Sequence, residues 1–546
     1  MLIESVCIVG GGSSGWMTAA ALSKLCPHLQ IALIESPNIK TVGVGESTLG
    51  HFNKFLRLLE LKDEDWMPEC NATYKNSIRF TNFANKNSGS FEYPFQTGYD
   101  YTDKGDFLQL NVFNEIKLRD PEFKIDFAEF YATSNTLLAK HCKQTKNSDG
   151  RLRLFNFEED TAYHLDAELF GKYLKEKVAI PNGVLHIVDD VVGQVRPEGF
   201  HHKEHGEFNE IFTEKGLSIQ ADLFIDCTGF KSKLLEGTCG SQFMSFGNIL
   251  ANDTAWAVRL PYGEDREKEM ENVTDCTALN NGWVWNIPLW NRIGTGYVFS
   301  SRFILPEDAK KEFLDHLADR YGKERIQDLE PFMINIRHGK RRRAWVDNVV
   351  GIGLSYGFVE PLESTGLLTT HENIIRLVEV LNRRKGFVSR SEKEAYNYSV
   401  DKELTGFAKF VSMHYAFSQR TDTPYWRWCT EINEYDQDMI DGVVRDFRTH
   451  ARIADCLDNG VIHPDLGGIP YILSGLGIEC ISTTAVSEMR KTRAGVTQTE
   501  YDLEVIKNNF MKHFNETTEY IKSLPSHYQY LKENIYGGVD QYDKSI

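Results

Sequence analysis

Three glycines near the start of the chain have the spacing of a dinucleotide-binding turn. The segment VCIVGGGSSGWMTAAAL places an apolar run, Val6 to Val9, directly before Gly10-x-Gly12-x-x-Gly15, and an alanine-rich helical stretch follows. In such a turn the first glycine makes the bend, the second lets the backbone approach a pyrophosphate, and the third lets the helix pack on the strand. The N–H groups at the start of the helix would face the phosphates.

A second apolar run, IALIE, supplies the acid that such a site needs. It ends at Glu35, where a carboxylate can accept hydrogen bonds from ribose hydroxyls. Far downstream, ADLFIDCTGFKS (221–232) has the pattern of a buried strand that ends in an acid and a Thr-Gly turn, which favours FAD over NAD. We find no second complete glycine turn, so a separate NAD(P)H domain is not expected. The predicted FAD-binding residues from this motif are Gly10, Gly12, Ser13, Gly15 and Glu35.

The composition excludes several classes of function. The chain has 61 basic and 78 acidic residues, and a net charge of −17 repels nucleic-acid phosphates and anionic lipid surfaces. Its ten cysteines show no CxxC spacing, so zinc ribbons and thioredoxin chemistry have no support, and we expect no metal site. Glu4 interrupts any signal peptide, and no stretch approaches membrane-spanning length. We therefore expect a cytoplasmic protein that binds neither nucleic acid nor membrane.

The elements that position the glycine turn belong to an α/β fold, which we expect to be the FAD-binding fold of the flavin monooxygenases. A chain of 546 residues is too long for one compact core. We predict an FAD-binding α/β domain over 1–384, with an aromatic-rich inserted cap at about 51–160. The pattern becomes mainly helical over 385–546, which we assign to substrate binding.

Two charged segments are expected on the surface. GEDREKEMENVTD (263–275) is predicted as a solvated connection, and KRRRAW (340–345) as a solvated or acid-paired turn. Between these two charged segments, GWVWNIPLW (282–290) is predicted as a strand in which Trp283, Trp285 and Ile287 share one face. Core packing alone explains such a pair of indoles, because aromatic side chains suit half-buried strands.

Four segments in this order resemble the flavin-dependent halogenases, the family typified by the tryptophan halogenases. They are TVGVGEST (41–48), NATYKNSIRF (71–80), GWVWNIP within the tryptophan segment, and GFVEPLESTGLL (357–368), and the resemblance covers most of the first 430 residues. The family uses reduced FAD, supplied by a separate flavin reductase, together with O2 to oxidise a halide ion to hypohalous acid. The acid then travels through the protein to a lysine beside an aromatic substrate. The missing NAD(P)H domain fits this division of labour.

The resemblance implies roles for individual residues. Lys75 matches the essential lysine, which either hydrogen-bonds hypohalous acid or forms a haloamine with it, and Glu363 matches the second active-site residue, a carboxylate that orients the electrophile and removes the ring proton. Without the resemblance, Lys75 would be interpreted as a lysine whose side chain reaches solvent along an aromatic strand, and Glu363 as an acid at the start of a helix. Thr365 and Gly366 match the halide site. The further cofactor contacts implied are Gly45, Glu46, Ser47, Leu354 and Leu367.

The substrate end resembles the family less closely. In the segment FVSMHYAFSQRTDTPYWRW (410–428), the approximate positions expected to hold the ammonium of tryptophan carry His414, Tyr415 and Thr421, without the expected acid. We therefore expect an electron-rich aromatic substrate, an indole-type compound or a phenol, other than free tryptophan. The predicted substrate contacts are Phe95, Ser364, His414, Tyr415 and Trp426. For the aromatic residues among them, ordinary helix packing is an equal alternative. The choice among chloride, bromide and iodide is open, and a homodimer is compatible with the sequence.

The resemblance also gives the tryptophan pair a second interpretation. Trp283 and Trp285 are predicted to form a gate, a bulky wall that keeps the substrate ring away from the flavin while small hypohalous acid passes. Packing and gating are compatible, since a packed wall is how such a gate would be built. Two other functions stay open at this point: a flavin-dependent aromatic hydroxylase and a non-catalytic flavin-binding protein.

Overall fold

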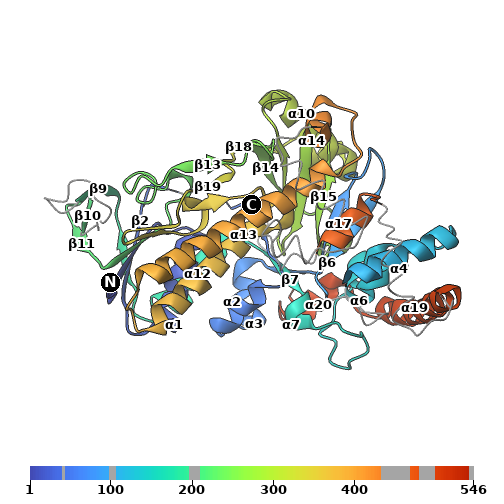
Figure 1. Ribbon diagram of the computed structural model, residues 1–546, viewed down its shortest axis with the longest axis horizontal. Helices are drawn as coiled ribbons and strands as arrows, with labels where there is room; N and C mark the ends of the chain where they lie inside the picture. Colours follow the sequence, from blue (N-terminus) through green and yellow to red (C-terminus); the bar gives the residue numbers. More distant parts are fainter. Residues whose placement is uncertain (40–42, 97–105, 196–209, 432–467, 479–498, 540–546) are drawn as a thin grey trace. The chain divides into compact units, whose positions relative to one another are not determined.

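The computed structural model describes residues 1–39, 43–96, 106–195, 210–431, 468–478 and 499–539 (Figure 1). The chain forms two compact units, and each consists of three segments that are separate in the sequence. The first unit contains Met1–Ala72, His164–Gly247 and Ile336–Thr405; the second contains Thr73–Tyr163, Asn248–Asn335 and Gly406–Ile546. The expected boundary after residue 384 falls inside the last segment of the first unit.

The first unit is built on a six-stranded sheet around the glycine turn. In spatial order its strands are β20 (Trp345–Val346), β21 (Val349–Gly351), β12 (Leu223–Asp226), β1 (Ser5–Val9), β2 (Gln30–Glu35) and β8 (Leu185–Val188). Neighbouring strands are parallel, apart from the short antiparallel pair of β20 with β21. The short apolar runs at Val6–Val9 and 223–225 are its buried central strands, as a parallel sheet covered on both faces requires. The α/β fold class is confirmed.

Helices and smaller sheets cover this sheet. Helix α1 (Ser13–Leu25) follows the glycine turn and packs against α8 (Ala167–Tyr173) and α12 (Thr365–Arg383). Two three-stranded antiparallel sheets are formed by β9 (Val191–Val195), β10 (Glu210–Thr213) and β11 (Ser218–Gln220), and by β13 (Phe243–Ser245), β19 (Gly339–Arg341) and β22 (Gly357–Phe358). The remaining elements of this unit are β3 (Glu46–Ser47), α2 (Phe52–Leu58), α3 (Asp63–Trp66), η1 (Pro68–Cys70), η2 (Leu174–Ala179), η3 (Gly229–Lys231), η4 (Gly353–Ser355) and η5 (Pro361–Glu363).

The second unit contains a seven-stranded sheet. Its spatial order is β18 (Phe332–Asn335), β14 (Thr254–Leu260), β17 (Ile293–Phe299), β16 (Gly282–Pro288), β15 (Val273–Ala278), β5 (Ser77–Thr81) and β6 (Ser90–Pro94). The strands alternate in direction except that β15 and β5 are parallel. This is the sheet that carries the tryptophan segment.

Most of the other elements of the second unit are helices. They are α4 (Asp106–Arg119), α5 (Phe127–Tyr131), α6 (Thr133–Lys140), α7 (Phe157–Asp160), α9 (Arg266–Glu269), α10 (Pro306–Tyr321), α11 (Lys323–Ile326), α14 (Pro424–Glu431), α17 (Ile469–Gly475), α19 (Thr499–Lys522) and α20 (His527–Asn534). Strand β4 (Thr73–Lys75) begins this unit; β7 (Ala162–Leu165) and α13 (Arg390–Ala416) run from one unit into the other. The described part of 385–546 is helical, as predicted. Within the described ranges, no helix combines the length and the apolar run that a membrane span requires.

The two indoles of β16 lie on one face of its sheet, as predicted. Trp285 pairs with Cys276 and Gly296, and the ring centroids of Trp283 and Trp285 are 6.2 Å apart. A Cβ atom at Gly296 would stand 2.2 Å from Cη2 of Trp285, so the indole lies flat over a strand position that has no side chain. The flat position of Trp285 therefore depends on glycine at 296.

The prediction of a solvated connection over 263–275 is wrong for part of the segment, since Glu264, Asp265 and Lys268 are exposed but other residues are buried. Residues 273–275 belong to β15 and are buried, and Arg266 is 8 % exposed. Its guanidinium lies 4.0 Å from the ring centroid of Trp290 and donates to the Trp290 carbonyl. The cation–π contact and the buried hydrogen bond explain why this charged segment turns inward.

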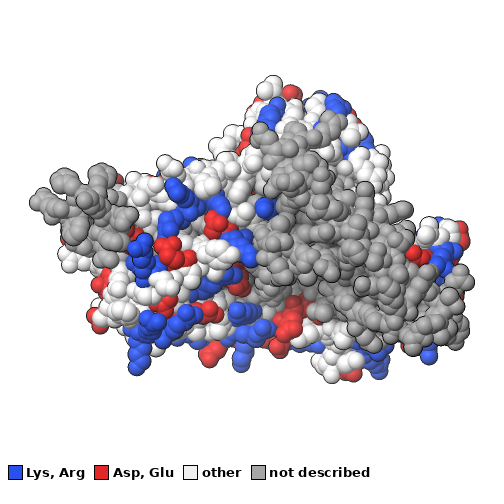
Figure 2. Space-filling view, viewed as in Figure 1, with Lys and Arg blue, Asp and Glu red and all other residues white. Residues whose placement is uncertain are grey.

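The basic segment KRRRAW begins on the buried strand β19 and continues as a bend with Arg342 exposed, and its predicted pairing with acids is confirmed. Lys340 and Arg341 lie on β19 and pair with Asp401 and Glu236. Arg343 pairs with Glu394. On the face drawn in Figure 2, basic and acidic side chains are interspersed around α2 and α12, and no continuous basic surface forms among the described residues.

Gly296→Ala should destabilise the protein because its methyl group would overlap the Trp285 ring and, at 2.6 Å, the Trp256 carbonyl. We expect a loss of about 1–3 kcal/mol in the free energy of unfolding, measured by urea denaturation. Gly171→Ala is the matched control, because its nearest non-neighbouring atom is 3.6 Å away and it lies within a helix. That control should change stability by no more than about 1 kcal/mol. Equal effects of the two substitutions would contradict the packing argument.

Candidate active site

The glycine turn of the first unit has the geometry that a pyrophosphate needs. Gly10 has φ +114°, and a Cβ atom there would be 2.3 Å from the Cys227 carbonyl oxygen. A Cβ at Gly15 would be 1.9 Å from the carbonyl oxygen of Gly10, whereas one at Gly12 would meet nothing within 4 Å. Packing therefore requires the first and third glycines, and the second leaves an open side. Helix α1 starts at Ser13 with no side-chain cap and no acid in its first turn, which fits a bound phosphate.

Glu35 stands at the end of β2, beside this turn. Its carboxylate accepts hydrogen bonds from Lys175 Nζ at 2.8 Å, His186 Nε2 at 2.7 Å and Trp16 Nε1 at 3.3 Å. Burial alone would raise its pKa, but the hydrogen bond and charge of Lys175 outweigh burial and hold the pKa of Glu35 below its usual value. The acid is thus a charged acceptor with a fixed orientation. Neither Lys175 nor His186 was predicted from the sequence as a partner of Glu35.

The segment EPLEST places the start of α12 where a small anion fits. Ser364 has φ +56° between η5 and α12, a strained conformation for a residue with a side chain. The Thr365 hydroxyl is buried without a hydrogen-bond partner among the described residues, and Gly366 leaves space beside its backbone, with Phe358 3.8 Å from a built Cβ. No side chain caps this helix and no acid lies in its first turn. An orphaned hydroxyl beside free helix N–H groups is a donor set for a halide ion.

Three contacts bring the predicted cofactor and halide segments together within the first unit. Ser364 Oγ donates to Ser47 Oγ at 3.0 Å, so the GEST loop touches the EPLEST segment. The Gly353 backbone, next to Leu354, lies against Ser14 of the glycine turn and Thr370 of α12; a Cβ atom at Gly353 would be 2.3 Å and 3.4 Å from their side-chain oxygens. The glycine turn, the loop and the start of α12 therefore form one continuous site.

Glu46 is a half-buried acid within that loop. It lies on β3, after Gly45 with φ +97°, and pairs with Leu165 of β7. Burial and the negative charge of Asp166 raise the pKa of Glu46 to about 7. Asp166 itself accepts the N–H groups of Glu168 and Leu169 at the start of α8. Glu46 is therefore a proton-carrying group near neutral pH, which the sequence did not predict.

Lys75 lies in the second unit, at the end of β4. Its side chain is 0 % exposed, and Nζ lies 4.9 Å from the ring centroid of Phe95. A lysine that reaches along an aromatic strand toward solvent would expose its ammonium, so this alternative does not fit. Phe95 follows β6 and is held by a hydrogen bond from its N–H to Asn135 Oδ1 at 2.8 Å. A buried amine against an aromatic face is suited to bind a small electrophile out of contact with water.

The predicted substrate residues of the second unit make packed contacts of their own. His414 is buried between the rings of Phe80 and Phe410, at centroid distances of 4.9 and 5.2 Å. The Tyr415 hydroxyl accepts from Asn252 Nδ2 at 3.2 Å. These residues line the inner side of α13 against the sheet.

Trp426 is held more completely than a substrate wall needs to be. It is 0 % exposed, its Nε1 donates to the Leu279 carbonyl at 2.8 Å, and the Arg420 guanidinium lies 4.4 Å from its ring. These are the contacts of a core side chain, as in the packing alternative.

The two units divide the predicted site residues between them. The first unit holds Gly10, Gly12, Ser13, Gly15, Glu35, Gly45, Glu46, Ser47, Leu354, Glu363, Ser364, Thr365, Gly366 and Leu367. The second holds Lys75, Phe95, Trp283, Trp285, His414, Tyr415 and Trp426. Of the first set, Glu363 is 1 % exposed at the end of η5, and Leu367 is 6 % exposed on α12.

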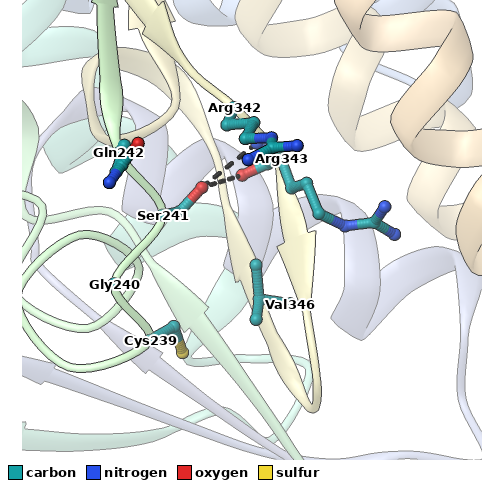
Figure 3. A pocket seen from close by; sticks show the side chains of 7 residues that line it. All are labelled: Cys239, Gly240, Ser241, Gln242, Arg342, Arg343 and Val346. Carbon is teal, nitrogen blue, oxygen red and sulfur yellow. Dashed lines mark hydrogen bonds between the residues drawn. The ribbon is translucent and has the colours of Figure 1, made fainter. Parts of the chain in front are cut away.

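A separate depression of about 440 Å³ lies on the first unit, away from these residues (Figure 3). Its lining is Cys239, Gly240, Ser241, Gln242, Arg342, Arg343 and Val346. Ser241 Oγ donates to the Arg343 carbonyl at 2.9 Å and accepts from the Arg343 N–H at 3.1 Å, so one wall is closed by these hydrogen bonds. No predicted site residue lines it.

The parallel sheet, the glycine turn and the charged acid at the end of β2 define the class of the protein as an FAD-fold oxidoreductase. Comparisons with known proteins narrow this class. A model of the tryptophan halogenase family matches residues 5–458, and the chain belongs to this family. It is therefore a flavin-dependent halogenase, and the expectation from its motifs is confirmed.

Individual relatives match over nearly their whole length. The 7-chloro-L-tryptophan 6-halogenase KtzR of Kutzneria sp. (strain 744) is 32 % identical over 550 residues, which is 96 % of this chain and 98 % of KtzR. The solved structure of apo VirX1 has a TM-score of 0.87 at 51 % identity and covers 98 % of this chain and 100 % of VirX1. Tar14, a tryptophan C-6 flavin-dependent halogenase (chlorinase) from taromycin biosynthesis, has a TM-score of 0.79 at 32 % identity, with 97 % and 99 % covered.

Glu46→Gln should change how stability depends on pH. Because the folded pKa of Glu46 is about 7 and the ordinary value is 4.5, the folded protein binds more protons than the unfolded chain between these values. The unfolding free energy of the wild type therefore contains a contribution that falls as pH rises from 4.5 to 7. Glutamine cannot ionise, so the variant lacks this contribution. Between pH 4.5 and pH 8 its unfolding free energy should therefore change more favourably than that of the wild type, by roughly 1–3 kcal/mol.

Urea denaturation at pH 4.5, 6 and 8 measures this difference. Glu60→Gln serves as the control, because Glu60 belongs to the same unit but lies at the surface, paired with Lys24. Parallel pH curves for Glu46→Gln and the wild type would show that Glu46 ionises normally.

Proposed function

We propose that this halogenase acts on an electron-rich aromatic compound, an indole or a phenol, and that Lys75 delivers the halogen. The observation that carries this proposal is the fully buried Lys75 side chain with its ammonium against the Phe95 ring. Reduced FAD, supplied by a separate flavin reductase, provides with O2 the oxidising equivalents that turn a halide ion into hypohalous acid. The glycine turn, Glu35, and the loop from Gly45 to Ser47 would hold FAD.

The halide ion binds at the start of α12 in this proposal. The Thr365 hydroxyl and the N–H of Gly366 donate to it, and the helix dipole favours a negative charge there. Because no acid lies in the first turn of α12, nothing on that turn repels the anion.

The chain's own residues then direct the transfer. The Lys75 ammonium donates a hydrogen bond to the oxygen of hypohalous acid, which makes that oxygen the better leaving group. The halogen bonds to a ring carbon, the O–halogen bond breaks, and the oxygen leaves as hydroxide. The Glu363 carboxylate takes the proton from the same ring carbon, and that proton and the hydroxide make water. The balance is one hypohalous acid and one arene to one haloarene and one water.

The proposed substrate is an indole or a phenol other than free tryptophan. Segment 410–428 contains one acid, Asp422, and its carboxylate is already bound by Nε and Nη2 of Arg420, each at 3.0 Å. With Lys86 Nζ also 3.8 Å from Oδ2, this carboxylate already has two cationic partners. Mass spectrometry of an indole and phenol library, incubated with FAD, a flavin reductase, NADH and each halide, tests the class of substrate. Faster turnover of free tryptophan than of any other compound in the library would contradict this part of the proposal.

Lys75→Ala should lower halogenation at least 100-fold while FAD still binds, because the variant loses the donor that activates hypohalous acid. Halogenated product is measured by mass spectrometry, and FAD binding by the quenching of its fluorescence. Lys146→Ala is the matched control, since this exposed lysine also lies over an aromatic ring, 5.8 Å from the centroid of Phe157. Wild-type halogenation by Lys75→Ala would rule out the assigned role, and a +16 product without halide would indicate a hydroxylase instead.

We propose further that the Trp283–Trp285 pair limits the escape of oxidant. Trp283→Phe should keep the fold but open the wall, so that more hypohalous acid is released per molecule of product. A chromogenic halogen acceptor in solution measures the released fraction. Trp256→Phe is the control, because Trp256 shares a register line with Tyr297 and Val284 and so lies on the opposite face of the sheet. An unchanged released fraction in folded Trp283→Phe would leave packing as the role of the pair.

A further inference from the structure

Strand β4, which carries Lys75, is fixed by residues from distant parts of the second unit. Before Lys75, Thr73 Oγ1 donates to the Pro288 carbonyl at 2.6 Å. After it, the N–H of Asn76 donates to the Asn272 carbonyl at 2.8 Å, and Asn76 Nδ2 donates to Gln144 Oε1 at 2.7 Å. Strand β4 pairs with β7 in a three-stranded sheet, but three residues make few ladder hydrogen bonds, so these contacts help to fix where its backbone lies.

The N–H of Tyr74, the residue directly before Lys75, is bound by a histidine from the other end of the sequence. His527 Nε2 lies 3.2 Å from the Tyr74 nitrogen. The other ring nitrogen, Nδ1, lies 3.2 Å from the Met270 carbonyl oxygen. A carbonyl only accepts, so Nδ1 carries the proton, and Nε2 is then the acceptor for Tyr74 N–H. Both contacts require one neutral tautomer.

The His527 ring is held in place from several directions. The residue is 0 % exposed, and its own N–H donates to the Cys142 carbonyl at 2.9 Å. Ser526 caps helix α20 and its hydroxyl donates to Glu267 Oε1 at 2.5 Å. Burial lowers the pKa of His527 to about 4, so the neutral form persists at physiological pH.

We propose that His527 is a positioning residue for Lys75: it accepts the Tyr74 N–H and thereby fixes the backbone from which the lysine side chain extends. This inference rests on the role proposed above for Lys75. The Tyr74 N–H lies in the peptide plane that ends at the Tyr74 Cα, and the next peptide plane joins that Cα to the Lys75 Cα, so a shift of the Tyr74 N–H is passed on to Lys75 through one Cα. A misplacement of about 1 Å can cost about 100-fold in rate.

Two amide substitutions separate positioning from general support of the fold. His527→Gln can place an oxygen near the position of Nε2 and accept the Tyr74 N–H. His527→Asn, with a side chain shorter by one carbon, can place a nitrogen near Nδ1 and keep the Met270 contact, but it does not reach Tyr74. Each variant retains one of the two hydrogen bonds, which makes them a matched pair.

The first measurement is amide hydrogen exchange of the Tyr74 N–H in the protein without cofactor, by mass spectrometry of peptides spanning 72–78. We expect slow exchange in the wild type and in His527→Gln, and exchange at least tenfold faster in His527→Asn. The second measurement divides oxidant between halogenated substrate and hypohalous acid released to a solution acceptor, with FAD, a reductase and bromide. His527→Asn should lose at least tenfold in kcat, keep its KM for the aromatic substrate, and release correspondingly more oxidant. His527→Gln should retain most of the wild-type kcat.

Equal losses of kcat in both variants, in proportion to their loss of thermal stability, would overturn the positioning role, as would wild-type kcat in folded His527→Asn. If His527→Asn does not fold, Ser526→Ala loosens the start of α20 more mildly. It should then raise both the Tyr74 exchange rate and the released oxidant, and no change in either overturns the proposal. Failure of the Lys75 role itself is distinguishable, because Lys75→Ala would then halogenate normally whatever the Tyr74 exchange shows.

Discussion

The structure of the second unit is organised around the burial of one amine. A charged group removed from water must recover its lost hydration from fixed partners, and the Phe95 ring face is one of those partners for Lys75. Fixed partners help only if the lysine backbone is itself fixed. Strand β4 has only three residues and makes few ladder hydrogen bonds. The hydrogen bonds to Pro288 and His527 therefore help to fix the backbone from which the amine extends.

This constraint gives the GWVWNIP segment a second physical effect. Its tryptophans pack on one face of the sheet, and Gly296 makes room for Trp285. Its proline has no N–H for a sheet ladder, yet its carbonyl accepts the hydroxyl of Thr73, the first residue of the strand that carries Lys75. A wall of indoles and an anchored lysine strand therefore come from the same seven residues of β16. The packing of this strand and the role proposed for it therefore depend on the same residues.

The parts of the site that could be predicted are those whose chemistry is local in the sequence. Gly10, Gly12 and Gly15 lie within one turn, so their spacing alone indicated them, and the steric contacts at Gly10 and Gly15 agree with it. His527 could not be found in this way, because 453 positions separate it from Tyr74 and its role exists only through the tautomer that Met270 imposes. Arg266 was misjudged for a related reason. A run of charges predicts solvent, unless an aromatic stack such as that at Trp290 takes one of them inside.

In the first unit, the helix starts proposed to bind anions carry little negative charge of their own. Both helix starts proposed to bind anions, at Ser13 and Thr365, lack acids in their first turns and lack side-chain caps, so their N–H groups are left for a ligand. An acid does lie in the loop that touches Ser364, but burial and Asp166 raise the pKa of Glu46 to about 7. A carboxyl that holds its proton over much of the neutral range repels an anion less than an ionised one would. The same burial that costs stability at high pH thus lowers the negative charge that Glu46 brings to the loop beside the place proposed for the halide.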